Sequence, residues 1–149
     1  MKIAIGCDEA AFSMKEKVKE HLLSKGYEVK DFGVYDENPV LYPDIAMKVA
    51  VPVSKGEFDR GILICGTGIG MAMTANKVKG IRAAVCHDPF STERSILSNN
   101  AQIMCMGARV IAPQLALMLV DQWLSLEFKE CNSSQKIAKI CEYEEGNFQ

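Results

Sequence analysis

A cysteine and a threonine lie in a glycine-rich segment near the middle of the chain. Residues 65–70 read Cys-Gly-Thr-Gly-Ile-Gly and follow the apolar run 62–64. An apolar run of this kind is typical of a buried parallel strand, and the Ala- and Met-rich residues that come next are typical of a helix. The first N–H groups of such a helix lack acceptors, and glycines let the backbone approach a ligand, so the turn favours an anion. A thiolate is stabilised at the same position, which makes Cys65 a candidate base or nucleophile with Thr67 as a hydroxyl donor.

The glycine spacing alone leaves a second interpretation open. It matches neither the dinucleotide-binding fingerprint, whose last interval is wider, nor the phosphate loop that ends in a lysine and a hydroxyl residue. Free cysteines are among the most buried residue types, so Cys65 could also be a core residue in an ordinary turn between a strand and a helix.

The rest of the chain alternates between short apolar runs and amphipathic segments. No hairpin signal separates the runs, so the pattern predicts a five-stranded parallel sheet covered by helices on both faces, an α/β fold in a single domain over residues 1–149. The expected strands cover residues 3–5, 27–32, 61–64, 81–86 and 102–106. Besides the helix after the glycine turn, the expected helices cover residues 11–25, 43–54, 89–97, 113–126 and 133–143.

Polar residues follow three of the expected strands. Open sheets bind ligands at the carboxyl ends of their strands, so we expect these residues to converge on one crevice: Cys7, Asp8 and Glu9 after the first strand, residues 65–70 after the third, and His87 and Asp88 after the fourth. Asp8 could bind sugar hydroxyls, act as an acid or base, or cap the next helix. His87 could be catalytic or belong to a helix start.

Four methionines lie in the helix expected after the glycine turn and in the last expected strand. Met71, Met73, Met104 and Met106 are expected in the core, because methionine commonly fills gaps between packed elements.

Composition narrows the classes of partner. A net charge of −2 with both signs interspersed argues against a nucleic-acid surface, and no apolar stretch is long enough for a membrane span or a signal peptide. The six cysteines include no pair with metal-ligand spacing, and four of them lie in or at the end of apolar segments. Buried free thiols are typical of a reducing compartment, so we expect a cytoplasmic protein with no membrane partner.

Several segments together resemble the ribose-5-phosphate isomerase B family, which includes the galactose-6-phosphate isomerase subunits. They include residues 2–8, 59–70, 75–77 and 107–110, and the resemblance covers residues 1 to about 128. It implies a Rossmann-like αβα sandwich and a homodimer with composite active sites. It also implies interconversion of an aldose phosphate and its ketose isomer without metal or organic cofactor. The expected helix from about residue 133 carries few apolar residues, Ile137, Ile140 and Tyr143 among them, so it could reach across a two-fold axis in a dimer or a dimer of dimers.

The resemblance also implies roles for individual residues. Cys65 would be the base, Thr67 the proton donor to the sugar oxygen, and the N–H groups of Gly66 to Gly70 the donors to an enediolate oxygen. The residues expected to contact substrate are Asp8, Glu9, Tyr42, Gly66, Gly68, Ile69, Gly70, Asn99, Arg109 and Lys136.

Three positions depart from the family pattern. Glu9 stands where the family has a phosphate-binding histidine, Ser98 where it has the imidazole thought to open the sugar ring, and Asn132 within a thinned cationic cluster that retains Lys136. A carboxylate beside a phosphate is repulsive, and a missing ring-opening group would suit an open substrate such as a four-carbon sugar phosphate. Two further hypotheses remain: a subunit of a two-component isomerase, and a non-catalytic sugar-binding protein.

Overall fold

The computed structural model describes residues 1–147 and contains one parallel sheet between two layers of helices. Its five strands lie in the order β2-β1-β3-β5-β4. They are β1 (Lys2–Cys7), β2 (Glu28–Asp31), β3 (Arg60–Cys65), β4 (Ala83–Val85) and β5 (Ile103–Gly107). The predicted α/β class and parallel sheet are confirmed.

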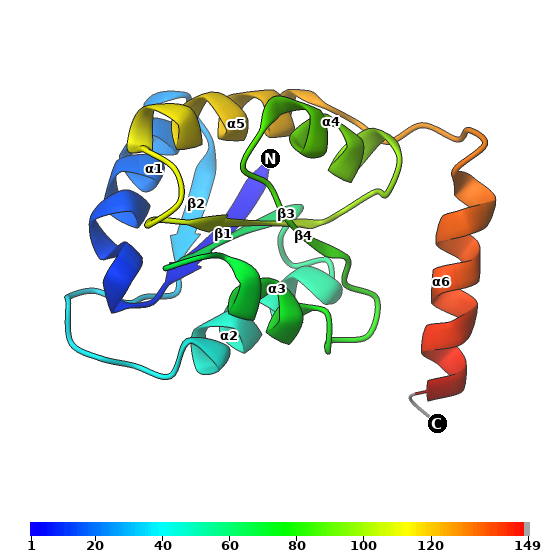
Figure 1. Cartoon of the computed structure of the whole chain (residues 1–149), viewed down its shortest axis with the longest axis horizontal. Coiled ribbons are helices and arrows are strands. Elements are labelled where there is room, and N and C mark those ends of the chain that lie inside the picture. Colours follow the sequence, from blue (N-terminus) through cyan, green and yellow to red (C-terminus); the bar gives the residue numbers. More distant parts are fainter. Residues whose placement is uncertain (148–149) are drawn as a thin grey trace.

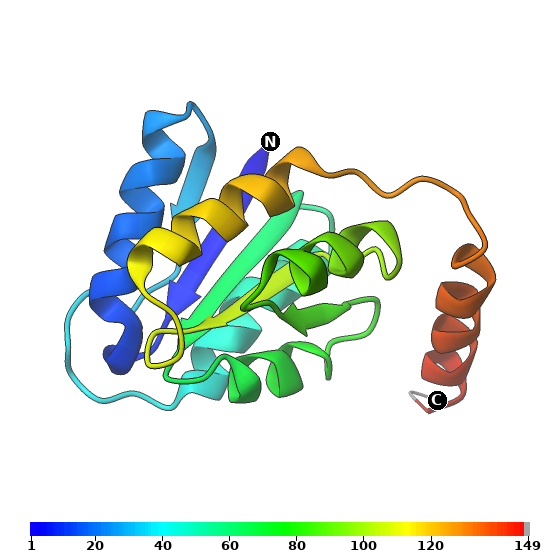
Figure 2. The same cartoon turned by 45° about the horizontal axis from the view of Figure 1, so that its top comes forward.

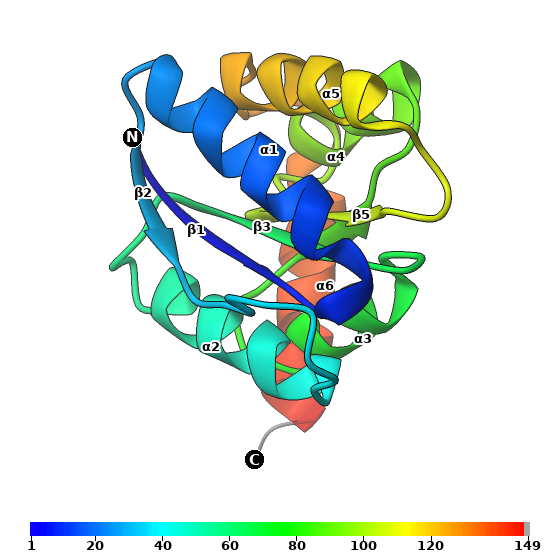
Figure 3. The ribbon, with the colours of Figure 1, turned by 90° about the vertical axis from the view of Figure 1, so that its left-hand side faces the viewer.

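Helices cover both faces of the sheet. One layer contains α1 (Phe12–Ser24), α4 (Pro89–Leu97) and α5 (Pro113–Ser125), and the other contains α2 (Tyr42–Ser54) and α3 (Ile69–Ala75) (Figures 1 and 3). A short 3-10 helix, η1 (Glu9–Ala11), joins β1 to α1. Since both faces are covered, the central strands β1, β3 and β5 are buried along almost their whole length, which explains their continuous apolar runs.

The expected bounds hold to within a few residues, with two informative differences. The strand expected over 81–86 is shortened to β4, because the Gln102 side chain hydrogen-bonds to the backbone that precedes β4. Arg82 N donates to Gln102 Oε1 at 2.8 Å, and Gln102 Nε2 donates to the Gly80 carbonyl at 2.8 Å. The last helix, α6 (Ser134–Asn147), continues beyond the expected residue 143.

Three of the four methionines lie in the core as expected. Met71, Met104 and Met106 are fully buried, but Met73 is 65% exposed, so its expected burial is wrong. Both Met71 and Met73 belong to α3, where two residues correspond to roughly 200° of rotation, so the two side chains leave opposite sides of the helix.

A buried lysine ties α1 to β2. The Lys15 side chain is 0% exposed, and its Nζ donates to Asp31 Oδ2 at 2.8 Å and to the Val34 carbonyl at 2.5 Å. The charge is therefore paired, and its second bond holds the beginning of the loop that leads to α2.

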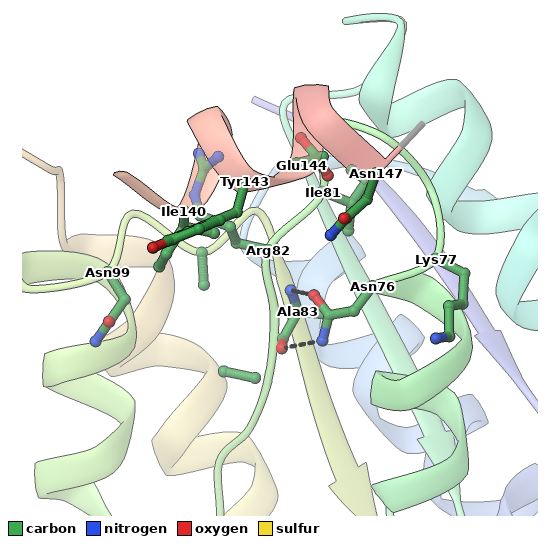
Figure 4. A pocket seen from close by; sticks show the side chains of 12 residues that line it. Asn76, Lys77, Ile81, Arg82, Ala83, Asn99, Ile140, Tyr143, Glu144 and Asn147 are labelled. Atoms are coloured by element: carbon green, nitrogen blue, oxygen red, sulfur yellow. Dashed lines mark hydrogen bonds between the residues drawn. The ribbon is translucent and has the colours of Figure 1, made fainter. Parts of the chain in front are cut away.

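The outer edge of the sheet is partly covered by a side-chain amide. Asn76 Nδ2 donates to the Ala83 carbonyl at 2.9 Å, and Ala83 N donates to Asn76 Oδ1 at 2.8 Å (Figure 4). This pair imitates the bonds of a neighbouring strand and satisfies the first residue of the edge strand β4.

The helix α6 stands apart from the two layers at the end of an extended segment (Figures 1 and 2). It contacts the body through surface bonds, including Lys79 Nζ to Glu145 at 2.8 Å and Gly80 N to Glu144 at 2.9 Å.

Among the described residues, no helix has the length and apolar character needed to cross a membrane.

Candidate active site

The strand order reverses between β1 and β3, and this reversal locates the site. From β1 the chain moves outward to β2, whereas β3 lies on the other side of β1 and leads on to β5 and β4. In open α/β sheets the crevice at the carboxyl ends of two such strands is the usual place for a ligand. Asp8 and Cys65 stand at these two ends, and Asp8 N donates to the Ile64 carbonyl at 3.2 Å.

Cys65 is the last residue of β3 and begins the turn that enters α3. Its side chain is buried, and the Gly68 N–H donates to Sγ at 3.1 Å. Thr67 is exposed at the tip of the turn, where its Oγ1 accepts from Ile69 N at 3.3 Å. The predicted strand, turn and helix start are confirmed, and although Cys65 is as buried as a core cysteine, its sulfur is held by the turn.

The backbone at the end of β5 supports this turn from below. Gly68 has φ +77°, and a Cβ there would lie 2.9 Å from the Met106 carbonyl carbon; a Cβ at Gly107 would lie 2.7 Å from Thr67 Cα. Ala108 N donates to the Cys65 carbonyl at 2.8 Å, and Arg109 N donates to the Gly66 carbonyl at 3.0 Å. Sequence reasoning missed these backbone roles, because the contact joins segments about forty residues apart.

Asp8 presents an unsatisfied carboxylate oxygen. Its Oδ1 is buried and finds no hydrogen-bond partner within residues 1–147, and its side chain does not cap η1. Burial, and then the neighbouring Glu9 carboxylate, raise the pKa of Asp8 above its ordinary value, although the backbone N–H groups of Ala11 and Ala10, and then Arg109, act in the opposite direction. A buried acceptor without a partner favours a ligand that brings a donor, such as a hydroxyl group.

Glu9 is tied to the loop before α2. Its Oε2 accepts from Val40 N at 3.2 Å, and within the described residues it forms no ion pair with Arg109. The carboxylate therefore stays on the rim formed by the loop between β2 and α2.

Tyr42 and Arg109 approach the turn from two other segments. Tyr42 begins α2, and its ring would overlap a Cβ at Gly70, so glycine is needed there for the ring to lie against the turn. The Arg109 guanidinium lies over Gly66, where Nη1 would be 3.4 Å from an added Cβ. The structure thus brings Asp8, Tyr42, Arg109 and the 65–70 turn together.

Three residues expected in the crevice have other partners. Cys7 is a core residue, and burial raises the pKa of its thiol to about 12. Asp88 caps α4, since its Oδ1 accepts from Ser91 N at 2.7 Å. His87 Nε2 accepts from Gly107 N at 2.8 Å. The expected place in the crevice is therefore wrong for Cys7, whose side chain packs into the core. Asp88 belongs to the helix start, and His87 lies against Gly107, next to the Cys65 turn.

Asn99 and Lys136 are not brought to Cys65 within one chain. Asn99 follows α4, which starts near the carboxyl ends of the strands and runs back to their amino ends, away from Cys65. It lines a cavity of about 730 Å³ together with Asn76, Arg82 and Tyr143 (Figure 4). Lys136 is exposed on α6. Ser98, one of the three departures from the expected pattern, accepts from Arg94 Nη1 at 3.3 Å.

This geometry defines the class of the protein. It is a doubly wound α/β protein that places a thiol, a hydroxyl and an unsatisfied carboxylate where its strand order reverses. No group of three or more potential metal-ligating side chains occurs among residues 1–147. Residues 3–140 match the family described as Ribose/Galactose Isomerase, and the chain belongs to that family. The family expected from the sequence is confirmed.

Individual relatives cover almost the whole chain. It is 52% identical over 147 residues to a ribose-5-P isomerase B of Listeria innocua, covering 99% of both proteins. It is 49% identical over 147 residues to a D-erythrulose-4-phosphate isomerase of Pectobacterium atrosepticum, covering 97% of this chain and 95% of that protein. The structure of ribose-5-phosphate isomerase B from Clostridium thermocellum superposes with a TM-score of 0.97 at 45% identity, covering 99% of both chains.

Proposed function

We propose that the protein interconverts an aldose phosphate and its ketose isomer through a cis-enediolate. The observation that carries the proposal is the Cys65 thiol, held by the Gly68 N–H at 3.1 Å beside the unsatisfied Oδ1 of Asp8. Isomerisation requires a base that removes the proton from the carbon next to the carbonyl and returns it to the neighbouring carbon. As the thiolate, Cys65 Sγ takes this proton, so that the C–H bond breaks as the enediolate and the thiol form. The thiol then returns the proton to the other carbon, which completes the reaction and restores the thiolate.

The turn and its neighbours supply the remaining groups. The enediolate oxygen accepts from backbone N–H groups between Gly66 and Gly70. For Ile69, at the start of α3, this means exchanging its 3.3 Å bond to Thr67 Oγ1 for one to the substrate. The Thr67 hydroxyl moves the proton between the two sugar oxygens. Asp8 accepts from a sugar hydroxyl, Tyr42 lines the sugar pocket, and Arg109 binds the phosphate.

We further propose that the active unit is a homodimer, or a dimer of such dimers, in the cytoplasm. Asn99 and Lys136 lie away from Cys65 in their own chain, so a second copy would have to bring them to the sugar and phosphate. Two observations support such a contact: α6 stands apart from the body, and it exposes Ile140 and Tyr143. Six free cysteines favour a reducing compartment.

The substrate that suits the chain best is a short, open aldose phosphate of four carbons. Ser98 offers no imidazole for opening a sugar ring, and a four-carbon aldose phosphate has no stable furanose phosphate to open. Glu9, anchored by Val40 N, adds a negative charge at the rim, which disfavours the phosphate position occupied in relatives that carry a histidine there. Ribose 5-phosphate is the second candidate, because the Listeria relative is named for it.

A coupled isomerase assay tests the proposal with four-, five- and six-carbon aldose phosphates and their unphosphorylated sugars. We expect erythrose 4-phosphate to turn over faster than ribose 5-phosphate, and Cys65→Ala to lower kcat by at least about a thousandfold with an unchanged circular dichroism spectrum. Activity on ribose 5-phosphate alone would contradict the substrate length, and full activity of Cys65→Ala would remove the thiol from the mechanism. If the wild type turns over none of these sugars, the two-component and non-catalytic alternatives are favoured.

A further inference from the structure

His87 accepts a hydrogen bond from a backbone group that touches the catalytic turn. It follows β4 and Cys86, and its Nε2 lies 2.8 Å from Gly107 N. A backbone N–H can only donate, so Nε2 must be the acceptor, and the imidazole is neutral with its proton on Nδ1. Burial lowers the pKa of His87 below its ordinary value, and the Asp88 carboxylate, which acts in the opposite direction, does not offset this effect. The acceptor form is therefore the stable form at neutral pH.

Gly107 begins a turn in which three consecutive backbone N–H groups have fixed partners. Gly107 N donates to His87, Ala108 N donates to the Cys65 carbonyl at 2.8 Å, and Arg109 N donates to the Gly66 carbonyl at 3.0 Å. The first of these bonds anchors the turn to the loop after β4, and the other two hold the segment that carries the thiol.

Gly107 packs on the catalytic turn so closely that no side chain fits between them. A Cβ on Gly107 would lie 2.7 Å from Thr67 Cα and 2.8 Å from its carbonyl carbon. The backbone of Gly107 is therefore packed beside the backbone of Thr67, and the position of one affects the position of the other.

We propose that His87 is a positioning residue for the reaction: its bond to Gly107 fixes the 107–109 turn, and that turn fixes Cys65, Gly66 and Thr67. This inference rests on the proposed isomerase function, in which these three residues act on the substrate. His87 itself does not touch the substrate, and its effect is transmitted through Gly107.

Two substitutions of His87 distinguish the effect of its hydrogen bond to Gly107 from the effect of the volume of its ring. His87→Leu keeps a similar volume without an acceptor, whereas His87→Gln can place Oε1 near the position of Nε2. We expect His87→Leu to lower kcat about tenfold to a hundredfold while KM changes less than about threefold, because displaced catalytic groups slow chemistry more than binding. We expect His87→Gln to restore kcat to within about threefold of the wild type.

The other histidine of the chain provides the matched control. His21 lies on α1, where its Nε2 is 2.8 Å from Asp121 Oδ1, far along the chain from the turn. His21→Leu is expected to leave kcat within about twofold of the wild type. Because the chain contains two histidines, this variant also leaves His87 as the one imidazole for ¹⁵N nuclear magnetic resonance.

The resonance measurement does not depend on activity, so it distinguishes failure of the His87 inference from failure of the proposed isomerase function. At pH 7.5 we expect His87 Nε2 unprotonated and Nδ1 protonated; a protonated Nε2 would overturn the inference even if the enzyme is active. Equal kcat for His87→Leu and the wild type would also overturn it, as would His87→Gln no better than a folded His87→Leu. If the wild type turns over no sugar but the expected tautomer is found, the isomerase proposal fails, and with it the role of His87 in catalysis, while the bond to Gly107 stands.

Discussion

At the scale of single residues, Gly68 shows how tightly the catalytic turn packs on β5. Its φ of +77° is unfavourable for any residue with a side chain, and an added Cβ would also lie 2.9 Å from the Met106 carbonyl carbon. Gly26 has a similar φ of +84° but no atom within 4 Å of the added carbon. The two positions therefore share the cost of the backbone conformation and differ in the available space.

This difference predicts the stability of two alanine variants. We expect Gly26→Ala to lower the free energy of unfolding by about 1 kcal/mol and Gly68→Ala by about 3 kcal/mol, since the second must also displace backbone. Urea unfolding of the two variants and the wild type measures both values. Equal losses would mean that the turn can move away from β5, and the tight support proposed for Thr67 would then be wrong.

At the scale of elements, the pair of Lys15 and Asp31 connects α1 to β2 and to the loop that carries the rim of the site. Asp31 is mostly buried and accepts from Lys15 at 2.8 Å, from Lys19 at 2.9 Å and from Gly33 N at 2.9 Å. Burial by itself would raise the pKa of Asp31, but the hydrogen bonds from Lys15 and Lys19 outweigh it and hold the pKa below its ordinary value.

The sign of this shift predicts a dependence of stability on pH. A carboxylate with a lowered pKa in the folded protein contributes stability that is fully present above its unfolded pKa, about 4, and is lost as the pH falls through the folded value. We expect Asp31→Asn to cost about 3 kcal/mol at pH 7, because it leaves the buried Lys15 charge with only the more exposed Glu16 carboxylate at 3.0 Å, and to cost much less at the acid end. Urea unfolding at several pH values measures this change.

Glu28 on the same strand is the matched control for Asp31. It pairs with Lys2 at 3.5 Å, but both side chains are exposed, so Glu28→Gln is expected to change stability by less than about 0.5 kcal/mol at every pH. A pH-independent cost for Asp31→Asn would contradict the ionic role of Asp31.

At the scale of the whole molecule, the position of α6 predicts the assembly. This helix exposes Ile140 and Tyr143, and the cavity between it and the edge of the sheet also contains Asn99 (Figure 4). A helix that leaves apolar side chains exposed beside a residue proposed for substrate binding suits a contact with a second copy. We expect the full chain to sediment as a dimer or larger at micromolar concentration, and Ile140→Glu to shift it toward monomer.

A control on another surface tests whether that effect is specific to α6. Met118 is similarly exposed, but on α5, so Met118→Glu is expected to leave the sedimentation coefficient unchanged. A strictly monomeric wild type would contradict the proposed dimer and, with it, the sharing of Asn99 and Lys136 between subunits.

The sequence by itself was sufficient for the alternation of strands and helices and for the turn around Cys65, because both depend on local features. Apolar runs predict buried strands, and glycines beside a helix start predict a close turn, whatever the strand order. It also predicted the positions of Asp8 and Glu9, since the end of β1 is a local boundary. Only the tertiary structure decided the rest. Strand order places Gly107 to Arg109 beneath Cys65 and His87 against Gly107, and packing exposes Met73, because these contacts join residues that are distant in the chain and leave no local pattern.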